Sequence, residues 1–152
     1  MLGFTILLVS TLFLASYLNL EAAELRDEIA CKEAIRRAIE AIREGNSRRF
    51  VEAIENHEGE VTEELNLRFE ALSQKITQER IKFAARYGEP LGTTELVKTE
   101  KISDRFLRFT VLDYHERSAA VYRISYYRPR ETWTFHFLNW SDDITTLYEK
   151  TP

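Results

Sequence analysis

The chain has 152 residues, of which 30% are charged and 44% are apolar, and its formal net charge is −4 at pH 7. Lysine and arginine are interleaved with aspartate and glutamate along the whole length and form no basic stripe, so nucleic acid is not an expected partner. The single cysteine, Cys31, excludes a disulfide framework within the chain and a cysteine-based metal site.

The N-terminal twenty residues form an apolar run without a charged side chain, and Glu21 is the first charged residue. Such a run is typical of the apolar core of a signal peptide or of a single membrane anchor. We expect residues 1–23 to be one of these, with a cleaved signal peptide favoured over a retained anchor. The flank after the run is acidic, whereas cytoplasmic flanks carry an excess of lysine and arginine. Residues 24–152 are therefore expected to form one domain on the periplasmic or extracellular side.

Three helices are expected in the first part of this domain. From 24 to 44 the apolar residues recur at helical spacing. The stretch "EGNS" at 44–47 ends this helix and starts a short second one, which "NHEG" at 56–59 breaks. The third and longest helix covers 61–87 and ends where Gly88 can take the C-cap conformation.

Beyond the third helix the period of the apolar residues changes from helical to two, which predicts strands. Four strands are expected, over residues 93–102, 105–114, 119–128 and 132–140. The polar breaks between them are short enough for hairpins. Three helices followed by an antiparallel meander predict an α+β fold.

Side-chain alternation divides the predicted sheet into an apolar face and a mixed face. We expect Asp113 to pair with Ala120 and Tyr127 to pair with Thr132. The apolar face then consists of Leu107, Phe109, Val111, Asp113, Ala120, Tyr122, Ile124, Tyr126, Trp133, Phe135, Phe137 and Asn139. This face is expected to pack against the helices. The mixed face, which includes His136, is either solvated or covered by a second copy of the chain.

Three segments resemble the nuclear transport factor 2-like, or cystatin-like, α+β cone. They are "AIRRAIEAIREGNSRRFVEAI" at 34–54, "RYGEPLG" at 86–92, and the run from "RFLRFTVLDYHERS" at 105–118 to "SDDITTLYE" at 141–149. The chain is similar to small exported bacterial proteins of that superfamily with no established activity. The resemblance implies a curved sheet wrapped on the long helix, with a cavity at the wide end. Relatives use this cavity for isomerase, dehydratase or hydrolase chemistry, for ligand binding or as core, and many form dimers through the outer sheet face.

The strongest candidate site lies on the predicted apolar face, where Asp113 and Asn139 share a row and Tyr122 lies on the next. A carboxylate in apolar surroundings can have a raised pKa, so Asp113 is the candidate general base, with Tyr122 or Asn139 polarising a carbonyl. The alternative is that Asp113 lies at the strand end and reaches water or turn amides. Tyr126 and Trp133 are candidate pocket residues at the other end of the sheet.

Established nucleotide-binding, hydrolase and metalloprotease motifs do not occur in the sequence. His57, His115 and His136 are scattered over a predicted loop, turn and strand, so neither a metal site nor a cofactor is expected. His57 and His115 are expected to be exposed. Ser141 precedes two aspartates and is expected to cap a closing helical turn.

These observations favour an exported or membrane-tethered, non-catalytic domain that binds a small apolar or amphipathic ligand, or a protein partner, at the cell envelope. The membrane would be contacted only through the N-terminal segment. One alternative is a small isomerase-like or dehydratase-like cavity enzyme that uses Asp113. Another is an envelope interaction domain that forms a homodimer through the mixed sheet face.

Overall fold

The computed structural model describes residues 25–56 and 61–148. Its helices are α1 (Glu28–Arg43), α2 (Ser47–Glu55) and α3 (Glu63–Tyr87). Its strands are β1 (Pro90–Ser103), β2 (Phe106–His115), β3 (Ala119–Tyr127) and β4 (Thr134–Ser141), and a short 3-10 turn, η1 (Thr145–Leu147), follows them.

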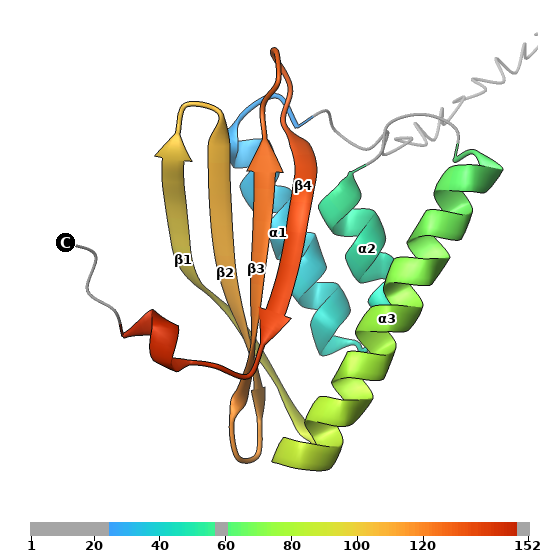
Figure 1. Cartoon of the computed structure of the whole chain (residues 1–152), viewed down its shortest axis with the longest axis vertical. Helices are drawn as coiled ribbons and strands as arrows, with labels where there is room; N and C mark the ends of the chain where they lie inside the picture. The colour runs from blue at the N-terminus through green and yellow to red at the C-terminus, as the bar shows by residue number, and fades with distance from the viewer. Residues whose placement is uncertain (1–24, 57–60, 149–152) are drawn as a thin grey trace, which may run out of the picture.

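The strands form one antiparallel sheet in the order β1-β2-β3-β4, and the helices lie on one side of it (Figure 1). The predicted α+β fold, three helices on a four-strand antiparallel sheet, is confirmed. The predicted signal peptide or anchor at 1–23 and the predicted exposure of His57 lie outside the described residues. Within the described ranges, no helix has the length and apolar character needed to cross a membrane.

Each helix begins at a side-chain cap. Asp27 accepts a hydrogen bond from the backbone N–H of Ala30, and Asn46 and Thr62 do the same at the starts of α2 and α3. The last helix ends at Gly88, whose φ of 87° favours glycine. A Cβ at this position would also collide with the Glu116 side chain. Local sequence therefore determines where the helices start and stop.

The core lies between α1, α2 and the inner face of the sheet. Its fully buried side chains include Cys31, Ile35, Ile42, Phe50, Val51, Ile54, Leu107, Phe109, Val111, Ile124 and Tyr126. In contrast, α3 buries only Phe69 and Ile76 completely. Figure 1 shows α1 behind the sheet, α2 beside β4, and α3 on the far side of α2. The long helix is thus the least embedded of the three.

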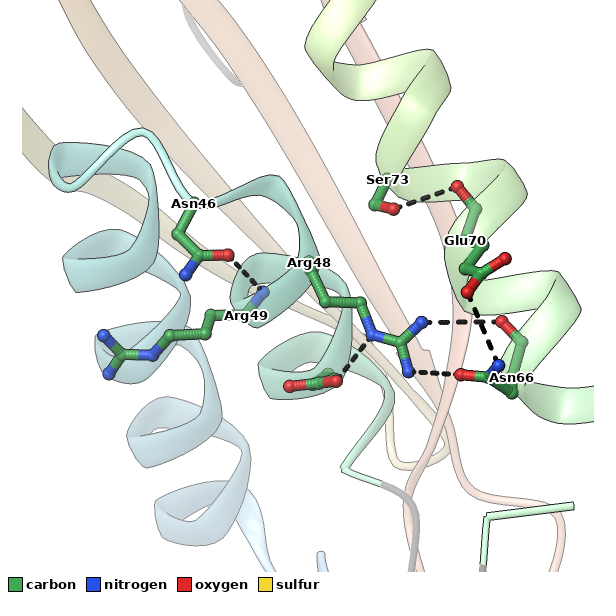
Figure 2. A network of polar contacts seen from close by, with 7 residues as sticks. Asn46, Arg48, Arg49, Asn66, Glu70 and Ser73 are labelled. Carbon is green, nitrogen blue, oxygen red and sulfur yellow. Dashed lines mark hydrogen bonds and ion pairs between the residues drawn. The ribbon is translucent and has the colours of Figure 1, made fainter.

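A polar contact network joins α3 to α2 (Figure 2). Arg48 Nη2 donates to Asn66 Oδ1 over 2.8 Å, and its Nε donates to Glu52 Oε1 over 2.6 Å. The Arg48 guanidinium also lies 5.2 Å from the centre of the Phe69 ring. Arg48 therefore links α2 to α3, alongside the contacts of Arg68 with Glu55 and of Thr77 with Ser47.

The β2–β3 register is the predicted one, with Asp113 opposite Ala120. The predicted β3–β4 register is wrong, because Tyr127 pairs with Thr134 and not with Thr132. A further register shift follows between Ser125 and Tyr126. Relative to the predicted register, β4 is displaced by two residues at Tyr126 and Tyr127 and by three residues from Ser125 onward. A displacement by an odd number of residues exchanges the two faces of a strand.

Trp133 explains the first part of this shift. It was expected inside the strand, but its backbone N–H donates to Leu25 O over 2.7 Å, and its ring is buried in the core. The Arg128 guanidinium lies 5.1 Å from the ring centre. The chain therefore needs six residues between the strands, and β4 starts at Thr134.

The shift changes the face of the C-terminal half of β4. Leu138 pairs with Ile124 and packs partly buried against the core, as does Trp140 opposite Tyr122. Asn139 instead pairs with Arg123 on the outer face. The prediction that Asn139 shares a row with Asp113 on the inner face is therefore wrong.

The outer face of the sheet is partly covered by the chain itself. Val121 and Thr110 on this face are buried within the monomer. Arg123 donates a hydrogen bond to Thr146 Oγ1 in η1, and Figure 1 shows this turn on the side of the sheet opposite the helices. Near one end of the face, the rings of Phe106 and Tyr127 stack with centroids 4.7 Å apart. Phe137, which the register places opposite Ser125, is 55% exposed on the same face.

Replacing Arg48 with methionine is expected to lower the free energy of unfolding by about 1–2 kcal/mol, because it removes partly buried hydrogen bonds between helices. Arg49→Met is the matched control: Arg49 pairs with Glu44 at the surface, and its loss is expected to cost less than about 0.5 kcal/mol. Urea unfolding of the full-length chain in neutral detergent, followed by circular dichroism, measures both. Equal losses would contradict the structural role of Arg48.

The β4 register predicts opposite responses at adjacent positions. Leu138→Asp is expected to destabilise the fold by about 2–3 kcal/mol, because it places a carboxylate against the core. Asn139→Asp is expected to change stability by less than about 0.5 kcal/mol, because that side chain is exposed. Thermal unfolding of the two variants decides between the observed register and the predicted one, which requires the reverse order.

Candidate functional site

Asp113 lies on the inner face of β2, and only 1% of the residue is exposed. Its Oδ1 accepts a hydrogen bond from Thr94 Oγ1 over 3.1 Å. Its Oδ2 lies 3.7 Å from Arg80 Nη2 and 3.7 Å from His115 Nε2. The groups around the carboxylate thus come from β1, α3 and β2. The expectation that Asp113 reaches water at the strand end is wrong.

The neighbours of Asp113 are themselves anchored to the backbone. Arg80 Nη1 donates to Ile42 O at the end of α1 over 2.8 Å. His115 Nδ1 lies 2.9 Å from Gly88 O, and because a carbonyl only accepts, Nδ1 is the donor. His115 was expected to be exposed, but it is buried, since its ring closes the end of α3. Arg80 and His115 are thereby held in place around the carboxylate.

Two atoms of this cluster, Asp113 Oδ2 and His115 Nε2, have no hydrogen-bond partner among the described residues. Burial raises the pKa of the Asp113 carboxyl, while Arg80, Thr94 and His115 oppose the rise. A raised pKa is a property of general bases, but a base must also reach the proton that it abstracts. The protein groups enclosing Asp113 leave it almost no exposed surface for a substrate.

The other predicted pocket residues do not gather around Asp113. Tyr122 is buried on the same face, with its ring edge-on to Phe50 at 5.7 Å between centroids, and burial raises its pKa. Tyr126 is fully buried and donates to Ile54 O over 2.8 Å. Trp133 belongs to the loop before β4, and Asn139 to the outer face. These aromatic residues are core side chains.

The acidic pair after β4 stabilises the end of the sheet. Asp142 accepts hydrogen bonds from Tyr87 and Arg86 of α3. Asp143 Oδ1 accepts from the backbone N–H of Thr145 over 2.9 Å, and the N-cap residue of η1 is Ile144. The prediction that Ser141 is the cap is wrong, since Ser141 ends β4. Within the described ranges, no group of three or more histidine, cysteine or acidic side chains has the arrangement of a metal site.

A polar hollow of about 600 Å³ lies between the α1–α2 turn and α3. Its side chains already serve the fold: Asn46 caps α2, Ser47 accepts a hydrogen bond from Thr77, and Arg48 binds Asn66. We therefore assign it no ligand.

Two open hollows lie end to end between α3 and β4, and together we call them the α3–β4 groove. The first, of about 470 Å³, is lined by Glu55, Arg68, Ala71, Leu72, Lys75, Phe135 and His136. The second, of about 380 Å³, is lined by Glu79, Lys82, Phe83, Arg86, Tyr87, Trp140, Ser141 and Asp142. Lys75 joins them, since its Nζ lies 5.4 Å from the centre of the Trp140 ring. The groove combines aromatic walls with mobile charged groups, as ligand sites do.

The groove was not predicted from the sequence, although two signals point to it. Arg68, Lys75 and Lys82 recur every seven residues, which places them on one side of a helix. On β4, Leu138 and Trp140 alternate with polar residues and mark an apolar row. The incorrect register assigned that row to the outer face.

Comparisons of the chain with protein-family models, with curated proteins and with solved structures give no match. The fold and the groove are thus the observations that bear on function.

The buried cluster predicts a pH-dependent response to the loss of Arg80. Arg80→Met is expected to destabilise the protein by about 3 kcal/mol at pH 7.5, because it leaves the Asp113 carboxylate buried without its cation. The pKa of Asp113 is higher in the folded chain than in the unfolded chain, so protonation of this carboxyl stabilises the fold. This stabilisation is complete below about pH 4 and is lost as the pH rises through the pKa of the folded state. Removing Arg80 raises that pKa further, and the deficit of the variant should therefore shrink at pH 4.5.

The double variant Arg80→Met/Asp113→Asn separates this charge effect from the titration of His115. It is expected to recover most of the loss at pH 7.5 and to show little extra pH dependence relative to the parent. Denaturant unfolding of the parent, single and double variants at both pH values gives the comparison. A deficit that is the same at pH 7.5 and 4.5 would show that Asp113 is not the group that Arg80 stabilises.

Proposed function

We propose that this chain is a non-catalytic binding domain, exported or tethered to the membrane, and that the α3–β4 groove is its binding site. The observation that carries the proposal is the contrast between a sealed carboxylate and an open groove. Asp113, the candidate base, is 1% exposed. The groove instead presents Arg68, Lys75 and Trp140 at the surface, and an aromatic and cationic lining suits recognition better than proton transfer.

We also propose that the fold is a nuclear transport factor 2-like cone. The element order supports this, with a broken helix pair and a long third helix before a four-strand meander. In such a cone the space between the long helix and the sheet is the site of function, which agrees with the position of the groove. The function assigned here rests on the groove and does not require the family.

The two alternative functions receive less support from the geometry. The enzyme needs Asp113 with Tyr122 or Asn139 at a cavity that a substrate can enter, whereas Asp113 and Tyr122 are buried and Asn139 is on the outer face. The dimer through the mixed face competes with the contact between Arg123 and η1. Of the hollows described, the groove is the one that combines open space with aromatic and cationic side chains.

The proposal is tested by site-specific photo-crosslinking in the native cells. Ala71 lines the groove, and Ile81 is an exposed residue of the same helix that does not line it. A benzophenone amino acid at position 71 is expected to give a defined adduct with a ligand or protein on the envelope, and the same group at position 81 is not. Mass spectrometry identifies the adduct.

A second substitution connects that adduct to the groove. Adding Phe135→Ser to the Ala71 crosslinking variant removes an aromatic wall and is expected to reduce the yield severalfold. Val97→Ser, which removes an exposed apolar group from β1, is the control. Crosslinks of equal yield from positions 71 and 81 would show that the groove is not the binding site.

A further inference from the structure

The two edge strands of the sheet differ in how they resist pairing with another strand. β1 carries Glu95, Lys98, Glu100 and Lys101, starts at a proline, and has three register shifts against β2. Charges, proline and bulges are the devices by which proteins block edge strands. β4 contains no lysine, arginine, aspartate or glutamate and has a single register shift. One edge of the sheet is thus blocked, and the other is open to pairing.

The two hollows of the α3–β4 groove lie at the two ends of this open edge. On the strand side the first is lined by Phe135 and His136 and the second by Trp140, Ser141 and Asp142, and on the helix side their lining runs from Arg68 to Tyr87. From Phe135 to Ser141 the strand spans about 20 Å at 3.3 Å per residue. An extended peptide of six to eight residues has the same length. The shape of the groove therefore matches a chain in β conformation better than a compact molecule.

The charges of the groove are arranged with the cations outward. In the pair of Arg68 with Glu55 the side chains are 61% and 8% exposed, and for Lys82 with Glu79 the values are 69% and 29%. Arg86 is 70% exposed and its partner Asp142 is 37% exposed. A ligand in the groove meets the arginines and lysines before it meets the acids. The groove therefore selects for negative charge.

We propose that the α3–β4 groove binds an extended acidic segment of a partner protein, which adds to the sheet as a strand beside β4. Main-chain hydrogen bonds to β4 would supply the part of the affinity that does not depend on the peptide sequence, as in other cases of strand addition. Aspartate or glutamate side chains at alternate positions would face Arg68, Lys75, Lys82 and Arg86 on the inner side of the sheet. The apolar residues between them would lie on the outer face, where Phe137 of β4 is 55% exposed. The inference rests on the proposed function and adds the chemical class of the partner.

The test uses the full-length chain in phosphatidylcholine nanodiscs and synthetic octapeptides with blocked ends. One peptide alternates glutamate with valine, a second alternates lysine with valine, and a third is the glutamate peptide with N-methyl groups on alternate amides. Fluorescence anisotropy of labelled peptides measures affinity, and hydrogen exchange measures protection of β4 and β1. The glutamate peptide is expected to bind and to protect β4. Lysine or N-methyl groups should weaken binding at least about tenfold.

Variants connect the binding to the named cations. The pair Arg68→Gln and Lys82→Gln is expected to weaken binding of the glutamate peptide by about tenfold. Lys98→Gln, on the blocked edge, is the matched control and should leave the affinity unchanged. Protection of β1, or equal binding of the lysine peptide, would overturn the proposal.

Two further outcomes separate this inference from the proposed function. Strand addition is overturned if the N-methylated glutamate peptide binds as tightly as the unmodified one. It is also overturned if dodecanoate displaces both glutamate peptides while β4 stays unprotected from hydrogen exchange. In either case the groove binds anionic amphiphiles. The groove then remains a binding site. If β4 protection rises with protein concentration in the absence of peptide, the edge pairs with a second copy, and the partner assigned here is wrong. Failure of the Ala71 crosslink removes the proposed function itself.

Discussion

The placement of α3 depends on the buried contact between Arg80 and Asp113. The long helix buries only two side chains completely, so packing alone holds it weakly against the rest of the domain. Arg80 links it at once to the carbonyl of Ile42 at the end of α1 and to the carboxylate on β2. Arg48 makes the equivalent link to α2 further along. Together with the contacts of Arg86 and Tyr87 to Asp142, these two arginines tie α3 to the elements that border the groove.

A buried carboxylate is a costly way to fix a helix, because desolvation of the charge opposes the attraction that it gains. The cluster reduces this cost with a hydrogen bond from Thr94 and a nearby imidazole. In return, the cluster fixes the orientation of α3. An arginine that must reach one carboxylate and one carbonyl can be satisfied in few orientations of the helix, whereas apolar contacts tolerate many. This explains why a residue with the attributes of a catalytic base has a structural role here.

The parts of the fold that sequence patterns predicted are those governed by local rules. Capping residues and Gly88 mark the helix ends, and the short turn between β2 and β3 leaves one register possible, so Asp113 pairs with Ala120 as expected. The start of β4 depends instead on a long-range contact between Trp133 and Leu25, at opposite ends of the described chain. No alternation of apolar residues contains that information. The error then spread to Asn139 and hid the apolar row of Leu138 and Trp140.

The burial of Cys31 has a consequence for the chemical durability of the protein. Its thiol lies in the core between α1 and the sheet, and burial raises its pKa to about 12. Oxidation and disulfide exchange proceed through the thiolate, which the folded protein therefore neither forms nor exposes near neutral pH. In the unfolded chain the thiol is exposed and forms the thiolate more readily. An oxidant would accordingly cross-link the molecules that have lost their fold and spare the others, so that irreversible damage in this chain follows the rate of unfolding.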